Sequence, residues 1–372
     1  MKGTTYPSWI ELSRANLLHN VRSIRALADP HASLFAVVKA NAYGHGIFEV
    51  SSLIRPYVDG YCVANTDEAI QLRSTIRGKR ILAMSYFTTL KKDHLRKCAS
   101  KAIEVVASGR EVLHILARSG IALSIHVKID SGTGRIGFQD SDIPYIISTV
   151  NKSKLRVRGI FSHFSDVENM ASTYWLSQLR SFDAMYNKLI SGLHTRSADR
   201  HIACSAAISR SKRTHGTLVR TGIHLYGLSG FSKIQDAHLD LRPVLSWKTS
   251  VIHIKKVPPG SFIGYNKTYK TTSPTTIVTV PLGYADGLDR HLSNTGRMLV
   301  GGAFAPIRGN VCMNLTMLET KKGKKIKLGD EVVCIGHQKN KKIEAYELAK
   351  QAGTINYEIV TRIPEQLPRI VV

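Results

Sequence analysis

The first two-thirds of the chain alternates short apolar segments with longer amphipathic ones. Eight short segments have the length and composition of buried strands, and they span Leu34–Ala40, Tyr61–Ala64, Arg80–Met84, Ile103–Ala107, Ser124–Ile129, Val157–His163, Ile202–Ser205 and Val219–Tyr226. Helices are expected over Phe48–Pro56, Thr66–Thr75, Gly109–Arg118, Ile143–Asn151 and Tyr174–Ile190. This order predicts an α/β fold whose eight parallel strands close into a (β/α)8, or TIM, barrel. A doubly wound open sheet is the alternative.

The pattern changes after Asp240. Helical periodicity disappears until Ile343–Ala352, and β-branched runs separated by glycine and proline turns replace it. These runs span Ser250–Val257, Thr275–Val280, Arg297–Val300 and Asp330–Ile335. We therefore expect a barrel over residues 1–240 and a C-terminal, mostly antiparallel β domain over residues 241–372. The first few residues of the chain are expected to pack with the β domain.

The chain is strongly basic. Its 52 Lys and Arg residues against 27 Asp and Glu residues give a formal net charge of +25. Such a charge raises the question of nucleic-acid or membrane-surface binding. The basic residues are spread along the whole sequence, however, and runs such as Lys321–Lys327 have the composition of solvated turns. We therefore interpret the charge as an aid to solubility and do not expect a nucleic-acid partner.

The five cysteines favour a reducing compartment. Their number is odd, they lie far apart, and no Cys-x-x-Cys occurs, which argues against a disulfide framework and a structural zinc site. No metal is expected. The first 15 residues lack the apolar core of a signal peptide. No stretch reaches the roughly 20 apolar residues that cross a bilayer, so we expect a cytoplasmic protein without membrane contact.

The strongest local signal is the segment Ala36–Gly46, AVVKANAYGHG. Its apolar strand delivers Lys39 at the carboxyl end, and a loop of small residues and glycine follows. Burying an ammonium group is costly unless the group has a partner or a chemical task. A Schiff base with a carbonyl cofactor is one such task. From this residue alone, a lysine that extends from the strand end into solvent is an equally good interpretation.

Ala36–Gly46 resembles the pyridoxal-phosphate attachment segment of alanine racemases, nearly position for position. Further matches follow in the same order through both expected domains, at Lys128–Gly137, Ser162–Phe164, His201–Ala207, Val219–Ile223, Tyr265, Gly283–Gly287, Val311–Asn314 and Gly353–Glu358. The resemblance implies a barrel followed by a β domain, with pyridoxal phosphate as cofactor. It also implies a homodimer with shared active sites that interconverts L-alanine and D-alanine and so supplies D-alanine for cell-wall peptidoglycan.

The same resemblance implies two bases on opposite sides of the substrate. Lys39 would form the Schiff base and handle the α-proton on the face of the D-enantiomer. Tyr265 would reach the active site of the other subunit and act on the L-enantiomer. Free tyrosine titrates near pKa ~10, and His163 and Arg220 would supply positive charge through a relay from tyrosine to histidine to arginine. Arg220 would also face the pyridine nitrogen and keep it unprotonated.

Binding roles follow from the resemblance as well. The residues that would hold the cofactor phosphate are Tyr43, Ser205, Gly222, Ile223 and Tyr357. Arg135 and the backbone amide of Met313 would contact the substrate carboxylate. Lys128 matches a lysine that is carbamylated in many relatives, where the carbamate pairs with the arginine. His201 and Tyr284 are expected to shape the entryway and the inner walls of the site.

Four positions depart from the family pattern. Cys204 replaces an asparagine, which removes hydrogen bonds expected beside the cofactor ring. Asn310 and Asn314 replace an arginine and an aspartate, so we expect the substrate corridor to select less by polarity. Asn266 stands where glycine is common, and because asparagine tolerates left-handed backbone better than most residues, we expect the turn to survive.

Four other functions remain open. A broad-specificity racemase would act on serine or lysine; Tyr357 argues for alanine because its ring narrows the methyl pocket, although a site rejects one extra hydroxyl only modestly. A decarboxylase of the same architecture would offer a cysteine from its partner and lack Tyr265. A non-catalytic pyridoxal-phosphate carrier would lack the β domain, and a nucleic-acid binder would show salt-dependent retention on DNA without racemisation.

Overall fold

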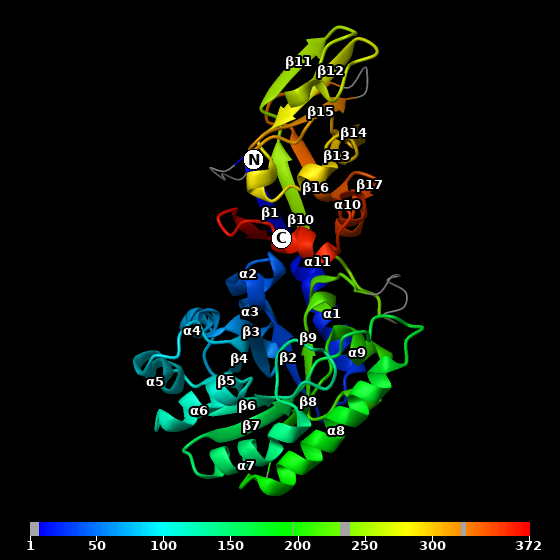
Figure 1. Ribbon diagram of the computed structural model, residues 1–372. Coiled ribbons are helices and arrows are strands. Elements are labelled where there is room, and N and C mark those ends of the chain that lie inside the picture. The colour runs from blue at the N-terminus through cyan, green and yellow to red at the C-terminus, as the bar shows by residue number, and fades with distance from the viewer. Residues whose placement is uncertain (1–6, 196, 231–238, 321–324) are drawn as a thin grey trace. The chain divides into compact units, whose positions relative to one another are not determined.

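The computed structural model describes residues 7–195, 197–230, 239–320 and 325–372. These residues form two compact units (Figure 1). The barrel unit contains residues 15–42 and 50–242, and the β unit contains residues 7–14, 43–49 and 243–372. No sequence signal indicated that residues 43–49 group with the β unit, because they directly follow the first barrel strand.

Eight parallel strands form the barrel unit, which confirms the predicted fold class. They are β2 (Ser33–Val37), β3 (Gly60–Asn65), β4 (Arg80–Tyr86), β5 (Ile103–Ala107), β6 (Ser124–Lys128), β7 (Arg156–Phe161), β8 (Asp199–His201) and β9 (Leu218–Thr221). Their order in the sheet is β8-β7-β6-β5-β4-β3-β2-β9. The N–H of Thr217 donates to the carbonyl of Arg200 at 3.0 Å, and that of Arg220 to the carbonyl of Ala203 at 3.1 Å. These bonds link β8 to β9 and nearly close the barrel.

The seventh strand differs from its prediction. The sequence favoured Ile202–Ser205, whereas β8 covers the three more polar residues before it. Ile202 and Ala203 are fully buried, so their apolar character reflects a buried loop that leads into α9 (Ser205–Arg210). The polar start of β8 is stabilised because Asp199 binds Arg80 across the barrel at 2.7 Å.

The eighth strand ends earlier than predicted. Val219–Tyr226 reads as one apolar run, but β9 stops at Thr221. Gly222 then adopts φ −122° and ψ −94°, and the short helix η4 (Ile223–Tyr226) follows. Arg220 therefore lies near the carboxyl end of its strand. The hydrophobic pattern of the sequence cannot show where a buried strand ends when a short buried helix follows it directly.

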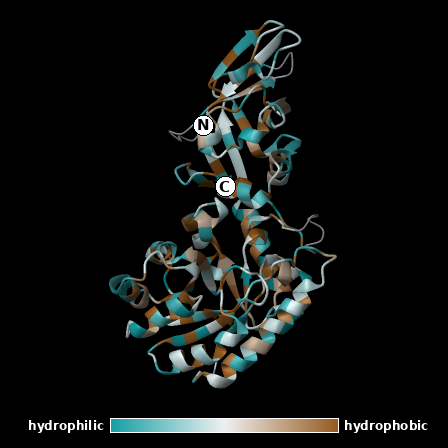
Figure 2. Ribbon diagram, viewed as in Figure 1, coloured by the Kyte–Doolittle hydropathy of each residue, from teal (hydrophilic) through white to brown (hydrophobic). Residues whose placement is uncertain are grey.

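Helices surround the barrel. Five were predicted to within a few residues, namely α3 (Ile47–Ile54), α4 (Thr66–Thr75), α6 (Arg110–Arg118), α7 (Ile143–Asn151) and α8 (Tyr174–Gly192). The predictions did not include α1 (Arg14–Leu27) or α5 (Lys92–Ser100). The short helices of this unit are η1 (Arg55–Tyr57), η2 (Asp140–Asp142) and η3 (Lys212–Thr214). Figure 2 shows hydrophobic residues along the barrel strands and hydrophilic residues over the helices. Within the described ranges, no helix combines the length and apolar character of a bilayer span.

The β unit contains two sheets. Its strands are β1 (Ser8–Leu12), β10 (Leu245–Ser250), β11 (His253–Val257), β12 (Thr275–Val280), β13 (Arg297–Val300), β14 (Ala303–Pro306), β15 (Thr316–Thr320), β16 (Glu331–Gln338), β17 (Lys341–Ile343) and β18 (Arg369–Val371). One sheet has the order β14-β13-β16-β10-β1-β18, with β17 paired to β16, and the other has the order β11-β12-β15. All pairs are antiparallel except β1 with β18. The predicted run Ser250–Val257 is divided between the two sheets.

The helices of the β unit are short. They are η6 (Tyr265–Lys267), η7 (Tyr284–Asp286), η8 (Arg290–Leu292), α10 (Ala345–Ala352) and α11 (Asn356–Thr361). A capping box in which Glu344 and Glu347 bond each other's backbone starts α10. Gly353 ends α10 in the left-handed region, with φ 71°.

Candidate active site

Lys39 follows β2 at the carboxyl end of the barrel strands, the end where barrel enzymes carry their active sites. It starts α2 (Lys39–Tyr43), and the next four residues have φ between 51° and 54°. A left-handed turn of ordinary residues costs about 1–2 kcal/mol per residue. Such strain persists where the surroundings impose it, and it concentrates at functional sites. The strained turn therefore fixes where the lysine leaves its strand.

Glu68 on α4 holds this turn in place. Its Oε1 accepts the N–H of Ala40 at 3.0 Å, and its Oε2 accepts the N–H of Ala64 at 2.6 Å. One carboxylate thus ties the ends of β2 and β3 together. Inside the turn, the N–H of Ala42 donates to the carbonyl of Val38 at 2.9 Å. Sequence reasoning missed Glu68, because nothing in a helical TDEA segment shows where its side chain points.

The amine of Lys39 is shifted towards its neutral form. Burial lowers the pKa of Lys39, and the positive charge of Arg135 lowers it further, while Glu68 opposes both effects. A neutral amine is the form that can attack a carbonyl or accept a proton. The surroundings of Lys39 therefore favour the chemistry predicted for it.

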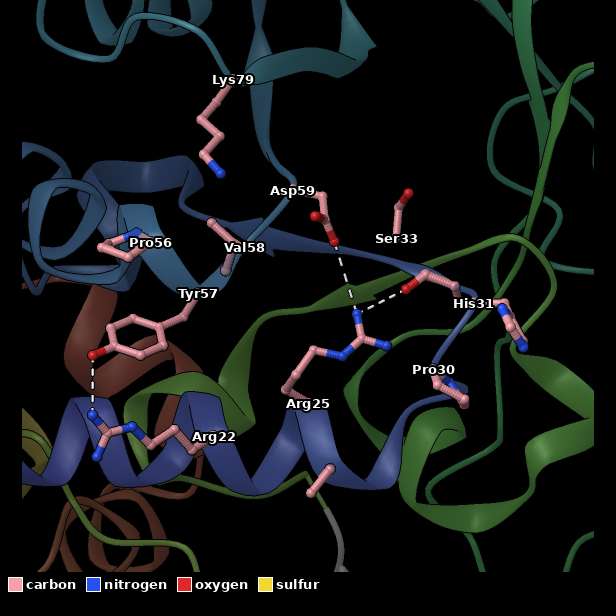
Figure 3. Close-up of a pocket in the computed structure, with 12 residues that line it drawn as sticks. Arg22, Arg25, Pro30, His31, Ser33, Pro56, Tyr57, Val58, Asp59 and Lys79 are labelled. Atoms are coloured by element: carbon pink, nitrogen blue, oxygen red, sulfur yellow. Dashed lines mark hydrogen bonds and ion pairs between the residues drawn. The ribbon is translucent and has the colours of Figure 1, made fainter.

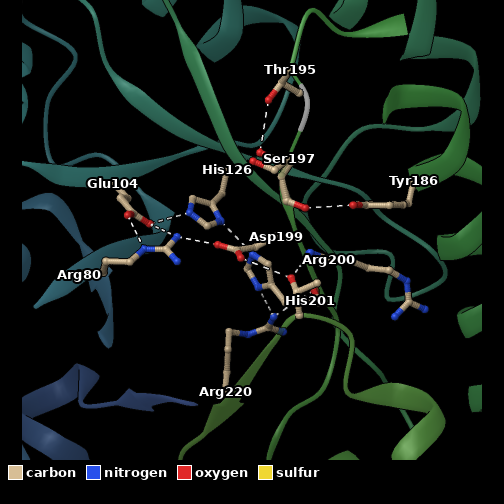
Figure 4. Close-up of polar contacts among 12 residues, drawn as sticks. Arg80, Glu104, His126, Tyr186, Thr195, Ser197, Asp199, Arg200, His201 and Arg220 are labelled. Atoms are coloured by element: carbon tan, nitrogen blue, oxygen red, sulfur yellow. Dashed lines mark hydrogen bonds and ion pairs between the residues drawn. The ribbon is translucent and has the colours of Figure 1, made fainter. Parts of the chain in front are cut away.

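A chain of buried polar groups runs from Arg220 through the barrel interior (Figure 4). Arg220 Nη1 lies 2.5 Å from Nδ1 of His201. Nε2 of His201 lies 2.8 Å from Nδ1 of His126, and Nε2 of His126 lies 2.7 Å from Oε2 of Glu104. Arg80 completes the chain, with Nε 2.7 Å from Oε1 of Glu104. Every member except Arg220 and His201 was absent from the predicted site.

The two ends of this chain dictate where its protons lie. A guanidinium only donates hydrogen bonds, so Nδ1 of His201 must accept from Arg220. Nε2 of His201 then carries the proton and donates to His126, whose own Nε2–H donates to Glu104. The hydrogen bonds therefore point in one direction, from Arg220 to Glu104, and both histidines are neutral.

The charges agree with this direction. Burial, followed by the charge of Arg220, holds the pKa of His201 well below its ordinary value. Burial alone would raise the pKa of Glu104, but hydrogen bonds from His126 and Arg80 outweigh it and lower that pKa to about 2. The chain thus has a carboxylate at one end, an arginine at the other, and two neutral rings between them.

This burial corrects one expectation. His201 is fully buried and its ring stacks on Phe161 with centroids 4.8 Å apart, so it belongs to the barrel interior and not to an entryway. Arg220 also donates to the carbonyls of Ser162 at 2.8 Å and Ile202 at 3.2 Å. Its guanidinium is therefore held in one orientation by carbonyl groups that directly follow β7 and β8.

His163 is half-buried just after β7. Burial, then the charges of Arg220 and Lys128, hold its pKa well below the ordinary histidine value. Among the described residues, no hydrogen bond joins the His163 ring to the guanidinium of Arg220. The donors of that guanidinium go to His201 and to carbonyl oxygens. The influence of Arg220 on His163 is electrostatic in this structure, and the expected relay between them is not formed as a direct bond.

Lys128 ends β6 inside the barrel. It is 3% exposed, and its amine has no hydrogen-bond partner within the described residues. The amine lies 4.9 Å from the centre of the Phe161 ring. Burial, then the charges of Arg220 and Arg135, hold the pKa of Lys128 well below its ordinary value. A buried amine in such surroundings is neutral, because an ammonium without a partner would be costly.

The loop after β6 carries Arg135, which is exposed. Asp130 organises this loop: its carboxylate accepts four backbone N–H groups, from residues 132 to 135, at 2.7 to 3.2 Å. Burial raises the pKa of Asp130, but these four hydrogen bonds outweigh it and lower the pKa. The carboxylate thereby fixes the backbone from which the Arg135 side chain extends.

Ser205 and Gly222 join the loops after β8 and β9. The N–H of Gly222 donates to the Ser205 hydroxyl at 2.8 Å, and both residues are buried. Because this hydroxyl oxygen already accepts one bond, its own proton is available for an oxyanion. Ile223 follows in η4, and Cys204 lies half-buried just before the serine. The chemistry of these donors fits a phosphate group.

The β unit places two predicted phosphate ligands together. The rings of Tyr43 and Tyr357 have centroids 6.1 Å apart and an interplanar angle of 48°. Gly44 follows with φ 79°, and an added Cβ would lie 1.9 Å from the carbonyl oxygen of Val360. Only glycine allows this close approach, so the segment that carries Tyr43 is held against α11.

Three other predicted residues lie on an exposed loop cluster of the β unit. Tyr265 is 69% exposed, Met313 57% and Tyr284 44%. The cluster is connected, because the N–H of Tyr284 donates to the carbonyl of Cys312 at 3.0 Å and the amide of Asn310 donates to the carbonyl of Tyr265 at 3.3 Å. Large apolar or aromatic side chains this exposed are typical of interaction sites.

The neighbouring departures from the family pattern can now be placed. Asn266 has φ 61°, which confirms that asparagine accepts the left-handed turn after Tyr265. Asn310 bonds the backbone of that turn, and Asn314 is exposed. Asn310 therefore stabilises the turn at Tyr265. Within the described residues, no contact explains Asn314.

Comparisons with known proteins agree with the geometry. The family "Alanine racemase, N-terminal domain" matches residues 12–230, and "Alanine racemase, C-terminal domain" matches residues 244–371. An alanine racemase of Halothermothrix orenii is 34% identical, covering 99% of this chain and 97% of that protein. Alanine racemase 2 of Caldanaerobacter subterraneus is 36% identical, covering 98% and 94%.

Solved structures give the same result. The alanine racemase of Clostridium difficile 630 superposes with a TM-score of 0.91 at 33% identity, covering 100% of this chain and 97% of that one. The alanine racemase of Bacillus anthracis with bound L-Ala-P superposes with a TM-score of 0.92 at 31% identity, covering 100% and 96%. The site geometry, both family matches and these full-length relatives lead to one conclusion: the chain belongs to the alanine racemase family.

Proposed function

We propose that this protein interconverts L-alanine and D-alanine with pyridoxal phosphate, as a cytoplasmic homodimer that supplies D-alanine for peptidoglycan. The observation that carries the proposal is Lys39, an amine of lowered pKa on a strained turn at the carboxyl end of the barrel strands. Family membership supports the same reaction.

The described residues fit the cofactor. When bound, pyridoxal phosphate withdraws electrons from the bonds of the substrate α-carbon and so acidifies its proton. The Lys39 amine would hold its aldehyde, and Arg220 would lie against its ring nitrogen. The Ser205 hydroxyl with the backbone of Gly222 and Ile223, and the hydroxyls of Tyr43 and Tyr357, would hold its phosphate.

Two proton-handling groups follow from the family match. The Lys39 amine would take and return the α-proton on the face of D-alanine, and the Tyr265 hydroxyl would do so on the face of L-alanine. His163, which is influenced by the charge of Arg220, would accept a hydrogen bond from the phenol. Inversion requires both groups, because a single base returns the proton to the face from which it came.

Arg220 would limit how much negative charge the cofactor ring accepts. Its donors are fixed by the chain that ends on Glu104, and a guanidinium delivers no proton near neutrality. With the ring nitrogen left unprotonated, Arg220 would favour return of the proton to the substrate α-carbon.

A homodimer explains the exposed cluster of the β unit. Tyr265, Met313 and Tyr284 stand in solvent on one chain, although the reaction needs the phenol beside a barrel site. Docking of this cluster onto the barrel unit of a second copy would bury it and complete two equivalent sites. The backbone amide of Met313 would then meet the substrate carboxylate.

Arg135 and Lys128 would act together on that carboxylate. Carbamylation of Lys128 would turn this neutral amine into an anion that pairs with Arg135. The neutral amine required for reaction with carbon dioxide is the form that burial favours. The Tyr357 ring would limit the side-chain pocket to a methyl group, which favours alanine over larger amino acids.

Incubation of the purified protein with each alanine enantiomer in deuterium oxide tests the proposal. Wild type is expected to form the other enantiomer and to deuterate the α-carbon. Tyr265→Phe is expected to lose racemisation in both directions while Lys39 still deuterates D-alanine without inversion. Tyr269→Phe, which removes a hydroxyl bonded to Glu319, serves as the control. An inactive wild type would refute the function, and normal racemisation by Tyr265→Phe would refute the two-base assignment.

A further inference from the structure

A strongly basic cavity lies at the end of the barrel where the parallel strands begin. Its volume is about 810 Å³. Its lining comes from the ends of α4 and α5, from the turns that follow them and from the starts of β4 to β7, and it includes Arg73, Arg77, Lys79, Lys101, Arg156 and Arg158. This is the opposite end of the strands from Lys39, although Arg80 and Glu104 of the buried polar chain also line the cavity.

The positive charge of this cavity is not neutralised within the structure. Only Glu104 among the lining residues is acidic, and its carboxylate is already bonded to Arg80 and His126. Asp199, the next nearest acid of this network, also binds Arg80. Within the described ranges, no ion pair is formed by the six other cationic groups of the lining, at Arg73, Arg77, Lys79, Lys101, Arg156 and Arg158.

Two local features build the cavity. Arg73 donates to the carbonyls of Ile76, Lys79 and Lys101 at 2.8 to 3.0 Å, which fixes the backbone of its wall. In β7, the pairing with β6 passes from Val157 directly to Gly159, so Arg158 is an unpaired bulge residue. A bulge redirects a side chain, and here Arg156 and Arg158 both line the cavity.

A neighbouring cavity shows that this accumulation of charge is local. It has a volume of about 680 Å³ and shares Lys79 (Figure 3). Its arginines are occupied, because Arg22 donates to the Tyr57 hydroxyl at 3.0 Å and Arg25 lies 3.8 Å from the Asp59 carboxylate. The arginines of this neighbouring cavity are therefore partnered, whereas Arg77, Arg156 and Arg158 of the basic cavity are left for an external anion.

We propose that the cavity at the starts of β4 to β7 binds a short polyphosphate chain, either free or as part of a nucleotide. Guanidinium groups form paired hydrogen bonds to phosphate oxygens, and a cavity of this size holds a small ligand. The described lining contains no aromatic side chain on which a base could stack, which disfavours single-stranded nucleic acid. It also contains no exposed apolar residue of the kind that enters a lipid surface.

Calorimetric titration of the holoenzyme with sodium tripolyphosphate tests this site. We expect binding that weakens as salt rises, because several charges are neutralised. The double variant Arg156→Glu/Arg158→Glu is expected to weaken binding at least about tenfold, and Arg77→Gln about threefold, because each removes charged hydrogen bonds. The control Lys255→Glu/Lys256→Glu makes the same change of charge on exposed β11 and is expected to leave the affinity within about twofold.

Titrations with other ligands show which class of phosphate compound the cavity binds. Equal affinity for tripolyphosphate and ATP would show that the cavity recognises the phosphate chain alone. Tighter binding of ATP would show that the phosphate chain belongs to a nucleotide. Adenosine is expected not to bind. The proposal is overturned if wild type gives no binding heat at low salt, if both double variants lose affinity equally, or if a single-stranded oligonucleotide binds more tightly than tripolyphosphate at equal phosphate concentration.

Discussion

The functional side chains of the two units are held in opposite ways. In the barrel unit, Arg220 and His201 are buried and each hydrogen bond in their chain has a defined direction. In the β unit, Tyr265 and Met313 stand in solvent on loops. The polar chain of the barrel unit is therefore formed within one chain, whereas the proposed function would have the exposed cluster of the β unit act on a second chain. The following predictions test this difference, from the largest expected effect to the smallest.

Replacement of Lys39 should have the largest effect on activity. Lys39→Ala removes both the covalent attachment and one base, so we expect racemisation to fall by at least about 10³-fold. Chiral chromatography of alanine after incubation measures it. Lys92→Ala, an exposed lysine on α5, should retain full activity. Substantial racemisation by Lys39→Ala would contradict the assigned role.

Mixing two inactive variants tests whether the sites are shared between chains. Lys39→Ala and Tyr265→Phe homodimers should each be inactive. After they are unfolded and refolded together, half of the dimers carry one intact site, so we expect about a quarter of wild-type activity.

The control for this experiment is co-refolding of Lys39→Ala with itself, which should give no activity. If Lys39 and Tyr265 of the same chain formed the site, the mixture would also stay inactive. Such a result would remove the explanation offered for the exposed cluster.

Replacement of Lys128 tests whether a carbamate in the barrel unit positions Arg135. We expect Lys128→Ala to lower kcat/KM by about tenfold, because the carbamate would no longer hold Arg135 in position. With ¹³C-labelled bicarbonate, wild type should show a carbamate resonance that Lys128→Ala lacks. Lys248→Ala should keep this resonance, because hydrogen bonds to Glu11 and Glu331 raise the pKa of Lys248. Absence of the resonance from wild type would contradict carbamylation.

Replacement of Glu104 should have the smallest effect on activity and a clear effect on the free energy of unfolding. Its pKa is lowered from 4.5 to about 2 in the folded chain. Its contribution to the unfolding free energy is therefore complete above about pH 4.5, on the order of 3 kcal/mol, and is lost as pH falls towards 2. Glu104→Gln should abolish this part of the pH dependence in denaturant unfolding, and reduce kcat by less than about tenfold.

Nitrogen NMR of the histidine rings gives a second measure of the same substitution. Wild type should show both His126 and His201 as Nε2–H forms, because the hydrogen bonds of the chain run from Arg220 to Glu104. Glu104→Gln should disturb both, whereas Glu319→Gln, which breaks a carboxylate–arginine pair in the β unit, should leave them unchanged. Normal histidine signals in Glu104→Gln would show that the chain does not depend on its acidic end.

The sequence determined the broad architecture and the reactive groups. Alternation of strands and helices was enough to predict the barrel, because buried parallel strands need apolar runs of limited length. The Lys39 segment and the later matching motifs identified the family, and most proposed ligands follow from them. Glu104 carried a weak signal that was not used, as a lone acidic residue within an apolar strand.

Only the tertiary structure decided which polar groups meet. Glu104, His126 and His201 lie on three different strands, and they join Arg220 because barrel closure brings those strands around one interior. The left-handed turn after Lys39 is likewise bonded to Glu68, which lies on another helix. Local sequence encodes periodicity and reactive groups, but hydrogen bonds between distant segments exist only after the chain has closed, so their partners had to come from the structure.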